Sequence, residues 1–193
     1  MRSERRLARM DSVLRRRQPD LTVVMENIHD PHNVSAMLRS CDAAGVMAVQ
    51  LLYTQEKFPR IGKKSSASAG KWVERRQFKS IDACYERLRA EGFRIYATHL
   101  AEGSVSLYGV DLTKKVAIVF GNEHRGVSDE AARKADGLLQ IPMVGMIQSL
   151  NVSVACAITL FEALRERLEH GYYERPRFSE IELKKLLEEW AKK

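Results

Sequence analysis

Residues 141–162, IPMVGMIQSLNVSVACAITLFE, form the stretch around which the rest of this 193-residue chain is arranged. A short apolar run ends at Pro142, a loop containing a glycine follows, and polar Ser149 and Asn151 stand directly before a long apolar segment. That segment has the length and composition of a buried helix. A helix start carries free backbone N–H groups and a partial positive charge, so it suits an anion or another polar ligand.

Ser149 and Asn151 also have a plainer explanation, because both residue types are favoured as helix N-caps. A cap needs only one such residue, and two polar side chains after a loop with proline and glycine are also typical of a binding site. The local sequence leaves both interpretations open.

The composition, 45% hydrophobic and 30% charged residues, is that of an ordinary globular protein. Its length allows one domain with a hydrophobic core and modest extensions. No apolar run approaches the roughly 20 residues of a membrane span, and the N-terminus lacks the apolar segment of a signal peptide. Cys41, Cys84 and Cys156 are far apart, so we expect buried, reduced thiols in a cytoplasmic protein, and neither disulfides nor a zinc site.

The positive charge is concentrated in two segments. Residues 1–17 carry seven arginines against two acidic residues, and residues 57–79 carry eight basic residues against Glu74 alone, in a chain of net charge +7. Basic side chains that neutralise phosphates release counterions, which favours binding to nucleic acid. One charged run usually indicates only a solvated surface, but two separate runs favour a nucleic-acid partner.

Apolar runs alternate with helical periodicity, which predicts an α/β fold with a parallel sheet. Asn33, Ser80 and Ser128 are the expected starts of helices. The predicted strands cover residues 21–25, 46–52, 93–98, 116–120 and 138–141. The predicted helices cover residues 33–44, 80–91 and 151–169, with a short helix from residue 128.

Helical arms are expected at both ends of the chain. Leu7, Met10 and Leu14 follow i, i+3, i+7 spacing, so the first helix can dock on the body while it presents arginines to solvent. The C-terminal helix has its own apolar stripe, which consists of Leu183, Leu186, Leu187 and Trp190. The expected division is an N-terminal arm, a central domain and a C-terminal arm, at residues 1–19, 20–169 and 170–193.

The helix over residues 151–169 is apolar nearly all round in its first half. Such a helix has to be buried on every side, whereas a small sheet covers only one side of it. We therefore expect a second subunit to cover the remainder, which predicts a homodimer.

The loop after the first predicted strand, NIHDPHN at residues 27–33, contains no glycine. It therefore lacks the G-x-G-x-x-G of dinucleotide-binding loops, and the chain has no P-loop. His29 and His32 have H-x-x-H spacing, but two histidines without further ligands make a poor metal site, so we expect no metal.

Three segments resemble, in order, the three signature motifs of the SpoU family of RNA 2'-O-ribose methyltransferases. They are ENIHDPHNVSAMLRSCDAAG, VFGNEHRGVS and IPMVGMIQSLNVSVA, at residues 26–45, 119–128 and 141–155. All three together are far more specific than any one of them. The resemblance implies the SPOUT fold, with helices on both faces of the parallel sheet and a deep C-terminal trefoil knot.

The resemblance also implies a chemistry, which is methyl transfer from S-adenosylmethionine to a ribose 2'-hydroxyl. By family analogy, the backbone near Thr98, Gly121, Ile141 and Leu150 holds this cofactor. We expect basic arms and no further N-terminal domain, and both expectations favour tRNA as the substrate and guanosine 18 of its D-loop as the target. Ribosomal RNA and the tRNA wobble nucleotide are alternative targets, and a non-catalytic RNA-binding protein is an alternative of another class.

Arg39 matches the arginine that the family treats as catalytic. Deprotonating an arginine near neutrality costs about 7 to 9 kcal/mol, so we expect Arg39 to orient the hydroxyl and an adjacent phosphate, with a role in proton relay left open. The alternative is an exposed arginine paired with Asp42 at i, i+3. Four further catalytic candidates match polar positions of the motifs, and these are Asn33, Glu123, Ser149 and Asn151.

An RNA-binding surface is the last site that we predict. His32 in the first motif is expected to contact RNA, and a comparable N-terminal arm grips tRNA in the family. The basic residues assigned to this surface are Arg5, Arg6, Arg9, Arg15, Arg16, Arg17, Lys63, Lys64, Arg165, Arg167 and Arg175.

Overall fold

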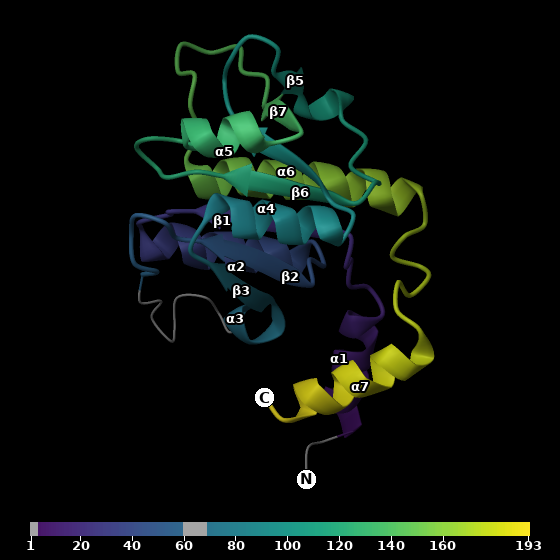
Figure 1. The fold of residues 1–193 in the computed structure, drawn as a ribbon. Helices are drawn as coiled ribbons and strands as arrows, with labels where there is room; N and C mark the ends of the chain where they lie inside the picture. Colours follow the sequence, from purple (N-terminus) through teal and green to yellow (C-terminus); the bar gives the residue numbers. More distant parts are fainter. Residues whose placement is uncertain (1–3, 60–68) are drawn as a thin grey trace.

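The computed structural model describes residues 4–59 and 69–193. Within them, one sheet of seven strands has the order β3-β2-β1-β6-β4-β7-β5, and all neighbouring strands are parallel (Figure 1). The predicted α/β fold with a parallel sheet is therefore confirmed. In chain order the strands are β1 Leu21–Glu26, β2 Ala48–Leu52, β3 Glu74–Phe78, β4 Arg94–Thr98, β5 Val105–Ser106, β6 Val116–Phe120 and β7 Gly137–Gln140.

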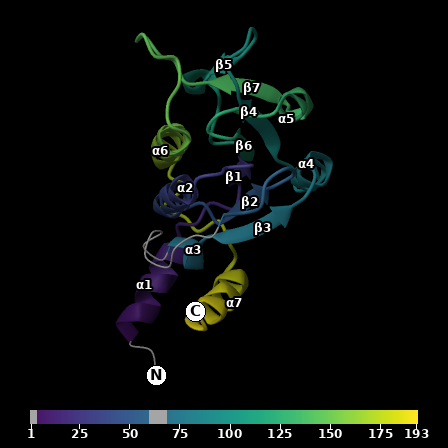
Figure 2. The same cartoon turned by 90° about the vertical axis from the view of Figure 1, so that its left-hand side faces the viewer.

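Helices cover both faces of the sheet. Figure 2 shows α2 and α6 on one side of the strands, and α4 and α5 on the other. Each face has its own buried apolar cluster. The helices are α1 Glu4–Leu14, α2 Pro31–Ala43, α3 Ala69–Trp72, α4 Ile81–Ala90, α5 Asp129–Lys134, α6 Val152–Glu169 and α7 Glu180–Ala191, with a 3-10 turn at Leu107–Gly109.

The strands β2, β1 and β6 are buried along their whole length. Strands with both faces covered have mostly apolar sequences, which is why these runs were readily predicted. Two strands escaped prediction. The sequence of β3 is ERRQF, which suits the edge of a sheet because charged side chains there oppose pairing with other chains. The other, β5, has only two residues.

Ser80 and Ser128 cap α4 and α5, as the sequence predicted. The exception is α2, whose N-cap is Asp30 and not Asn33. The carboxylate of Asp30 accepts a hydrogen bond of 2.8 Å from the backbone N–H of His32. Asn33 therefore lies inside the first turn, where its side chain is available for other contacts.

The two arms pack against each other. Met10 and Leu14 of α1 are buried together with Leu183 and Trp190 of α7, and Trp72 of α3 packs beside them. Both predicted apolar stripes are confirmed. The N-terminal stripe docks on the body through Trp72, but its buried partners lie on the C-terminal arm. Figure 1 shows α1 and α7 crossing outside the sheet.

Arg167 of α6, which we predicted to bind RNA, is instead fully buried. Its guanidinium donates to the carbonyl oxygens of Leu112 (3.0 Å) and Lys114 (2.8 Å) and to the side-chain oxygen of Gln18 (3.0 Å). It also forms an ion pair with Asp20. The prediction that Arg167 contacts RNA is therefore wrong, because the side chain does not reach the surface.

Arg17 is fully buried as well. Its Nη1 donates to the carbonyl oxygen of Val46 at 2.9 Å, and its Nη2 forms an ion pair with Asp42. The guanidinium also lies 5.3 Å from the centre of the Trp190 ring. These contacts join the N-terminal arm, the body and the C-terminal arm, so the predicted RNA contact of Arg17 is also wrong.

The three cysteines are unpaired and buried, as predicted. No helix in the part of the chain that the structure describes is both long and apolar enough to cross a membrane.

Arg167→Ala is expected to lower the free energy of unfolding by about 3 to 5 kcal/mol, because Asp20 keeps only the partly exposed Arg177 as a partner and the carbonyl oxygens of Leu112 and Lys114 lose their donor. Arg165, two residues earlier, pairs with Glu162 and Glu169 on the helix surface, so Arg165→Ala is the matched control and should cost less than about 1 kcal/mol. Urea unfolding followed by circular dichroism measures both. Equal losses in the two variants would contradict the structural role of Arg167.

Candidate active site at the carboxyl edge of the sheet

The three motif segments meet at one edge of the sheet. In a parallel sheet all carboxyl ends lie at the same edge, which is where open α/β proteins bind ligands. The first motif follows β1, the second follows β6, and the third follows β7. In the sheet β1 pairs with β6, β6 pairs with β4, and β4 pairs with β7. The loops that follow these four strands therefore lie side by side along one edge.

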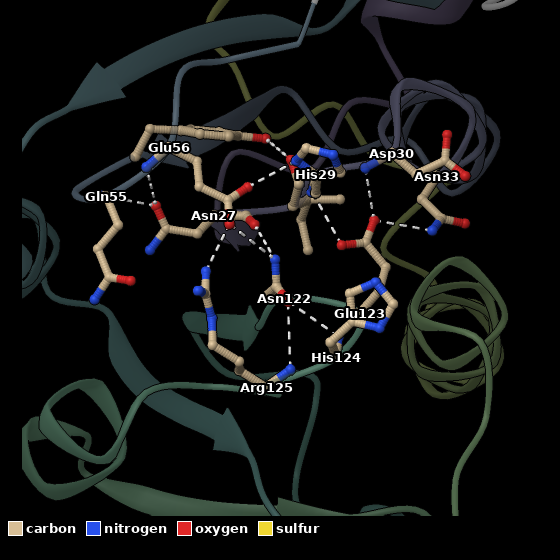
Figure 3. Close-up of polar contacts among 12 residues, drawn as sticks. Asn27, His29, Asp30, Asn33, Gln55, Glu56, Asn122, Glu123, His124 and Arg125 are labelled. Carbon is tan, nitrogen blue, oxygen red and sulfur yellow. Dashed lines mark hydrogen bonds and ion pairs between the residues drawn. The ribbon is translucent and has the colours of Figure 1, made fainter.

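A chain of hydrogen bonds joins three of the predicted catalytic residues. Asn33 donates from Nδ2 to Oε1 of Glu123 at 2.9 Å. Its Oδ1 accepts from Nδ2 of Asn151 at 3.1 Å, across 118 positions of sequence. The structure therefore brings one residue from each motif into direct contact. Figure 3 shows Asn33 and Glu123 facing each other.

Glu123 is anchored by backbone groups as well. Its carboxylate accepts from the backbone N–H groups of His29 (2.9 Å) and Asp30 (3.0 Å), in addition to Asn33 (Figure 3). Burial by itself would raise the pKa of Glu123, but these hydrogen bonds outweigh burial and hold the pKa below its ordinary value. Glu123 is thus an ionised anchor between two loops, and its contacts are with Asn33 and the backbone, not with Arg39.

Asn151 is the N-cap of α6, and the other interpretation, a binding site, stays a prediction. Its Oδ1 caps α6 by accepting from the backbone N–H (2.8 Å) and the hydroxyl (2.6 Å) of Ser153. Its Nδ2 remains free to bind Asn33. Ser149 lies exposed in the loop before the helix and makes no hydrogen bond to any residue that the structure describes.

Arg39 is exposed on α2. The alternative of a helix-surface pair with Asp42 is not realised, because the Asp42 carboxylate is bound to Arg17. Within residues 4–59 and 69–193, Arg39 forms no ion pair. Its guanidinium is therefore available to a ligand.

The residues predicted to hold the cofactor follow adjacent strands. Thr98 ends β4 and donates to the carbonyl oxygen of Val119 at 2.9 Å, Gly121 follows β6, and Ile141 follows β7. A side chain at residue 121 is impossible, because its Cβ would lie 2.0 Å from the carbonyl carbon of Gly126. Leu150 is 41% exposed at the end of the third loop.

Two further residues of this edge were not singled out from the sequence. Asn27 adopts a positive φ of 50°, and its Oδ1 accepts from the backbone N–H of Thr54 (3.0 Å) and Gln55 (3.2 Å). Asn122 donates to the carbonyl oxygen of Asn27 at 2.8 Å. The residue type is the sequence feature that could have identified them, because asparagine tolerates the left-handed conformation and forms local turns.

The predicted RNA-binding residues differ in exposure. Arg15 is tied to Asp11 and Glu180, and Arg165 to Glu162 and Glu169. Lys63 and Lys64 lie outside the described residues. The remaining members are exposed, and these are Arg5, Arg6, Arg9, Arg16, His32 and Arg175.

Among the residues that the structure describes, no group of three or more His, Cys, Asp or Glu side chains is arranged to hold a metal ion. His29 is engaged elsewhere, since its Nδ1 lies 3.0 Å from a carboxylate oxygen of Glu56.

Comparison with known proteins places these features in a family. The model of the SpoU rRNA Methylase family matches residues 20–161, which include every strand of the sheet. The chain is 47% identical over 192 residues to the tRNA (guanosine(18)-2'-O)-methyltransferase of Thermus thermophilus, covering 100% of this chain and 98% of that enzyme. It is 39% identical over 151 residues to a 23S rRNA (guanosine-2'-O-)-methyltransferase of Xanthomonas axonopodis, covering 77% of this chain and 59% of that enzyme.

Solved structures give the same result. The TrmH/SpoU tRNA modifying enzyme of Aquifex aeolicus has a TM-score of 0.92 and 42% identity, covering 98% of this chain and 96% of that one. The SpoU methyltransferase AviRb of Streptomyces viridochromogenes, solved with AdoMet, has a TM-score of 0.68 and 25% identity over 79% and 62% of the two chains. A protein described for 2-OH methylation of C/U34 on tRNA has a TM-score of 0.66 and 28% identity over 77% and 97%. From the family match and the full-length likeness, this chain belongs to the SpoU rRNA Methylase family.

Proposed function

We propose that this chain transfers a methyl group from S-adenosylmethionine to the 2'-hydroxyl of guanosine 18 in tRNA. The observation that carries the proposal is the 47% identity to a guanosine-18 enzyme over 100% of this chain and 98% of that enzyme. An identity that extends through both arms bears on the RNA substrate, because the arms lie outside the residues that match the family model.

The alternative RNA targets are less well supported. The match to the ribosomal RNA enzyme covers 77% of this chain, and so does the match to the C/U34 protein. Neither match is long enough to include the domain and both arms.

The proposed division at residues 1–19, 20–169 and 170–193 assigns tRNA binding to the arms. Exposed arginines of the arms are available to phosphates, and these are Arg5, Arg6, Arg9, Arg16 and Arg175.

The residues at the carboxyl edge fit S-adenosylmethionine. Thr98, Gly121 and Ile141 follow three adjacent strands, which leaves their backbone groups at the position where α/β sheets bind ligands. In the third loop, Met146 and Leu150 present exposed apolar side chains suited to contact an adenine ring. When bound, the cofactor supplies an electrophilic methyl group.

Arg39 is the residue that we assign to the reacting hydroxyl. Methyl transfer requires the hydroxyl oxygen to be held in line with the methyl carbon. A guanidinium presents several N–H donors in a fixed plane, so Arg39 can hold the ribose oxygen and a neighbouring phosphate together. The chain Glu123–Asn33–Asn151 then fixes α2 relative to α6 and so fixes the helix that carries Arg39.

We assign the active form to a homodimer that buries one face of α6. Cys156, Leu160 and Ala163 are buried in the apolar cluster that α6 shares with α2 and the sheet, whereas Val154 and Phe161 are 45% and 50% exposed on the other side of the helix. Leu168 continues this apolar stripe at i+7 from Phe161. Large apolar side chains aligned at that spacing are typical of a helix that meets another subunit.

A trefoil knot in the C-terminal part of the domain belongs to the same proposal. The last strand, β7, lies between β4 and β5, both of which precede it in the chain. A late strand that lies between two earlier strands supports a threaded chain.

We also propose a cytoplasmic location, which is in keeping with a tRNA substrate.

The substrate is tested by mapping 2'-O-methyl groups with mass spectrometry on a tRNA incubated with the purified chain and S-adenosylmethionine. We expect one methyl group at guanosine 18, and none in a tRNA with 2'-deoxyguanosine at that position. A methyl group at nucleotide 34, or in ribosomal RNA alone, would support the alternative targets. A chain that binds tRNA but gives no heat with S-adenosylmethionine in calorimetry would be a non-catalytic RNA-binding protein.

Arg39→Ala is expected to lower the single-turnover methylation rate by about 100- to 1000-fold, as expected for the loss of one donor that stabilises the transition state. Cofactor affinity should stay close to that of the wild type, because Arg39 lies on α2 and the proposed cofactor residues lie in other loops. Arg39→Lys should restore little, since it loses the planar fork. Arg133→Ala, at an exposed position of α5, is the control. A near-normal rate in Arg39→Ala would remove Arg39 from the mechanism.

Phe161→Glu is expected to convert the homodimer into monomers, because it places a charge in the apolar stripe of α6. Ile181 is 85% exposed on α7, so Ile181→Glu is the control and should remain dimeric. Sedimentation velocity at micromolar concentration measures both. If the wild-type chain sediments as a monomer, the dimer proposal is wrong.

A further inference from the structure

Glu56 lies outside the three motifs but makes side-chain contacts with two of them. It belongs to the loop that follows β2, and its side chain is 24% exposed. One carboxylate oxygen accepts from Nη2 of Arg125 at 2.6 Å, and the other lies 3.0 Å from Nδ1 of His29. Figure 3 shows Glu56 between these two side chains.

The backbone of Glu56 is itself held in place. Oδ1 of Asn27 accepts from the backbone N–H groups of Thr54, Gln55 and Glu56, at 3.0, 3.2 and 3.4 Å. A non-glycine residue with positive φ, such as Asn27, persists only where the surroundings hold it. The backbone that carries the Glu56 carboxylate is therefore held in a fixed position next to β1 and β2.

The two partners of Glu56 lie on the two loops that the proposed active site needs. His29 is the neighbour of Asp30, and Arg125 follows Glu123 by two positions. Glu123 already binds the first-motif loop through the backbone N–H groups of His29 and Asp30. Glu56 joins the same two loops a second time, through the side chains of His29 and Arg125.

Two carboxylates thus hold one pair of loops in a fixed relation. Asn122 and Ser128 also join the second-motif loop to the first motif, through the carbonyl oxygen of Asn27 and the carboxylate of Glu26. Glu56 adds a contact to the turn between them, at Arg125. Without Glu56 this turn is held less tightly, and a shift of the turn would reach Asn33 and the helix that carries Arg39 through Glu123. A displacement of about 1 Å in such an arrangement can cost about 100-fold in rate without any loss of a catalytic group.

We propose that Glu56 is a positioning residue for methyl transfer, which holds the second-motif loop against the first-motif loop so that Glu123 and Asn33 keep their geometry. The proposal rests on the function proposed above. Glu56 does not touch the reacting atoms, and it acts through Arg125 and His29. An isolated surface ion pair would be worth less than about 1 kcal/mol, whereas a carboxylate shared by two loops affects the site that both loops build.

The test uses Glu56→Ala, Arg125→Ala and the double variant in the full-length chain, with tRNA as substrate. We expect Glu56→Ala to lower kcat by about 10- to 100-fold, while KM for tRNA and Kd for S-adenosylmethionine change by less than about twofold. Because the two residues share one interaction, the double variant should lose less than the product of the two single losses. Glu56→Gln, which keeps one acceptor oxygen for Arg125, should fall between the wild type and Glu56→Ala.

The matched control is Glu130→Ala, which removes an ion pair with Lys134 (2.7 Å) on α5 and should leave kcat unchanged. A Glu56→Ala variant with the kcat of the wild type would overturn the proposal. A loss of kcat matched by equal losses of cofactor affinity and of thermal stability would also overturn it, and so would fully multiplicative losses in the double variant. If the wild-type chain itself methylates no tRNA, the proposed function fails, which is a separate outcome from a normal Glu56→Ala variant.

Discussion

The Glu123 carboxylate is the contact on which the carboxyl edge depends. Its two oxygens accept hydrogen bonds from two backbone N–H groups and one amide, all on the first-motif loop and helix. Asn33 in turn accepts a hydrogen bond from Asn151, which caps α6. One charged group therefore links the loop after β6 with the start of α2, and through it with the start of α6. The position of Arg39, farther along α2, depends on this linkage.

Arginines of this chain have two physically different roles that the sequence does not separate. Arg17 and Arg167 are fully buried and bind carboxylates and carbonyl oxygens, whereas Arg16 and Arg165 close by are exposed. In the amino-acid composition, all four of these arginines count equally as positive charges. Burial of a guanidinium is costly unless its donors find partners. In Arg17 the Nε finds none, whereas in Arg167 the partners come from residues 18–20 and 112–114. Such long-range partners cannot be identified from a local run of basic residues.

The difference between local patterns and long-range contacts also explains which features could be predicted from the sequence. The buried strands β1 and β6 and the helix α6 follow from long apolar runs. The motifs predicted that Asn33, Glu123 and Asn151 share one site, and the structure joins them by hydrogen bonds. The edge strand β3 was missed because its charged sequence resembles a loop. Glu56 was missed because a single loop glutamate carries no local signal; only the fold brings it to Arg125 and His29.

The electrostatics of the site restrict how a proton can leave the ribose. Glu123 is held ionised by its hydrogen bonds, its lowered pKa makes it a weak base, and both carboxylate oxygens already accept hydrogen bonds. Arginine side chains remain protonated in proteins, so Arg39 can stabilise a developing negative charge on the hydroxyl oxygen but does not readily accept its proton. A phosphate oxygen of the RNA or a water molecule is then the acceptor that the proposed arrangement leaves. Catalysis would therefore come mainly from positioning, which is the property that Glu123, Asn33 and Glu56 control.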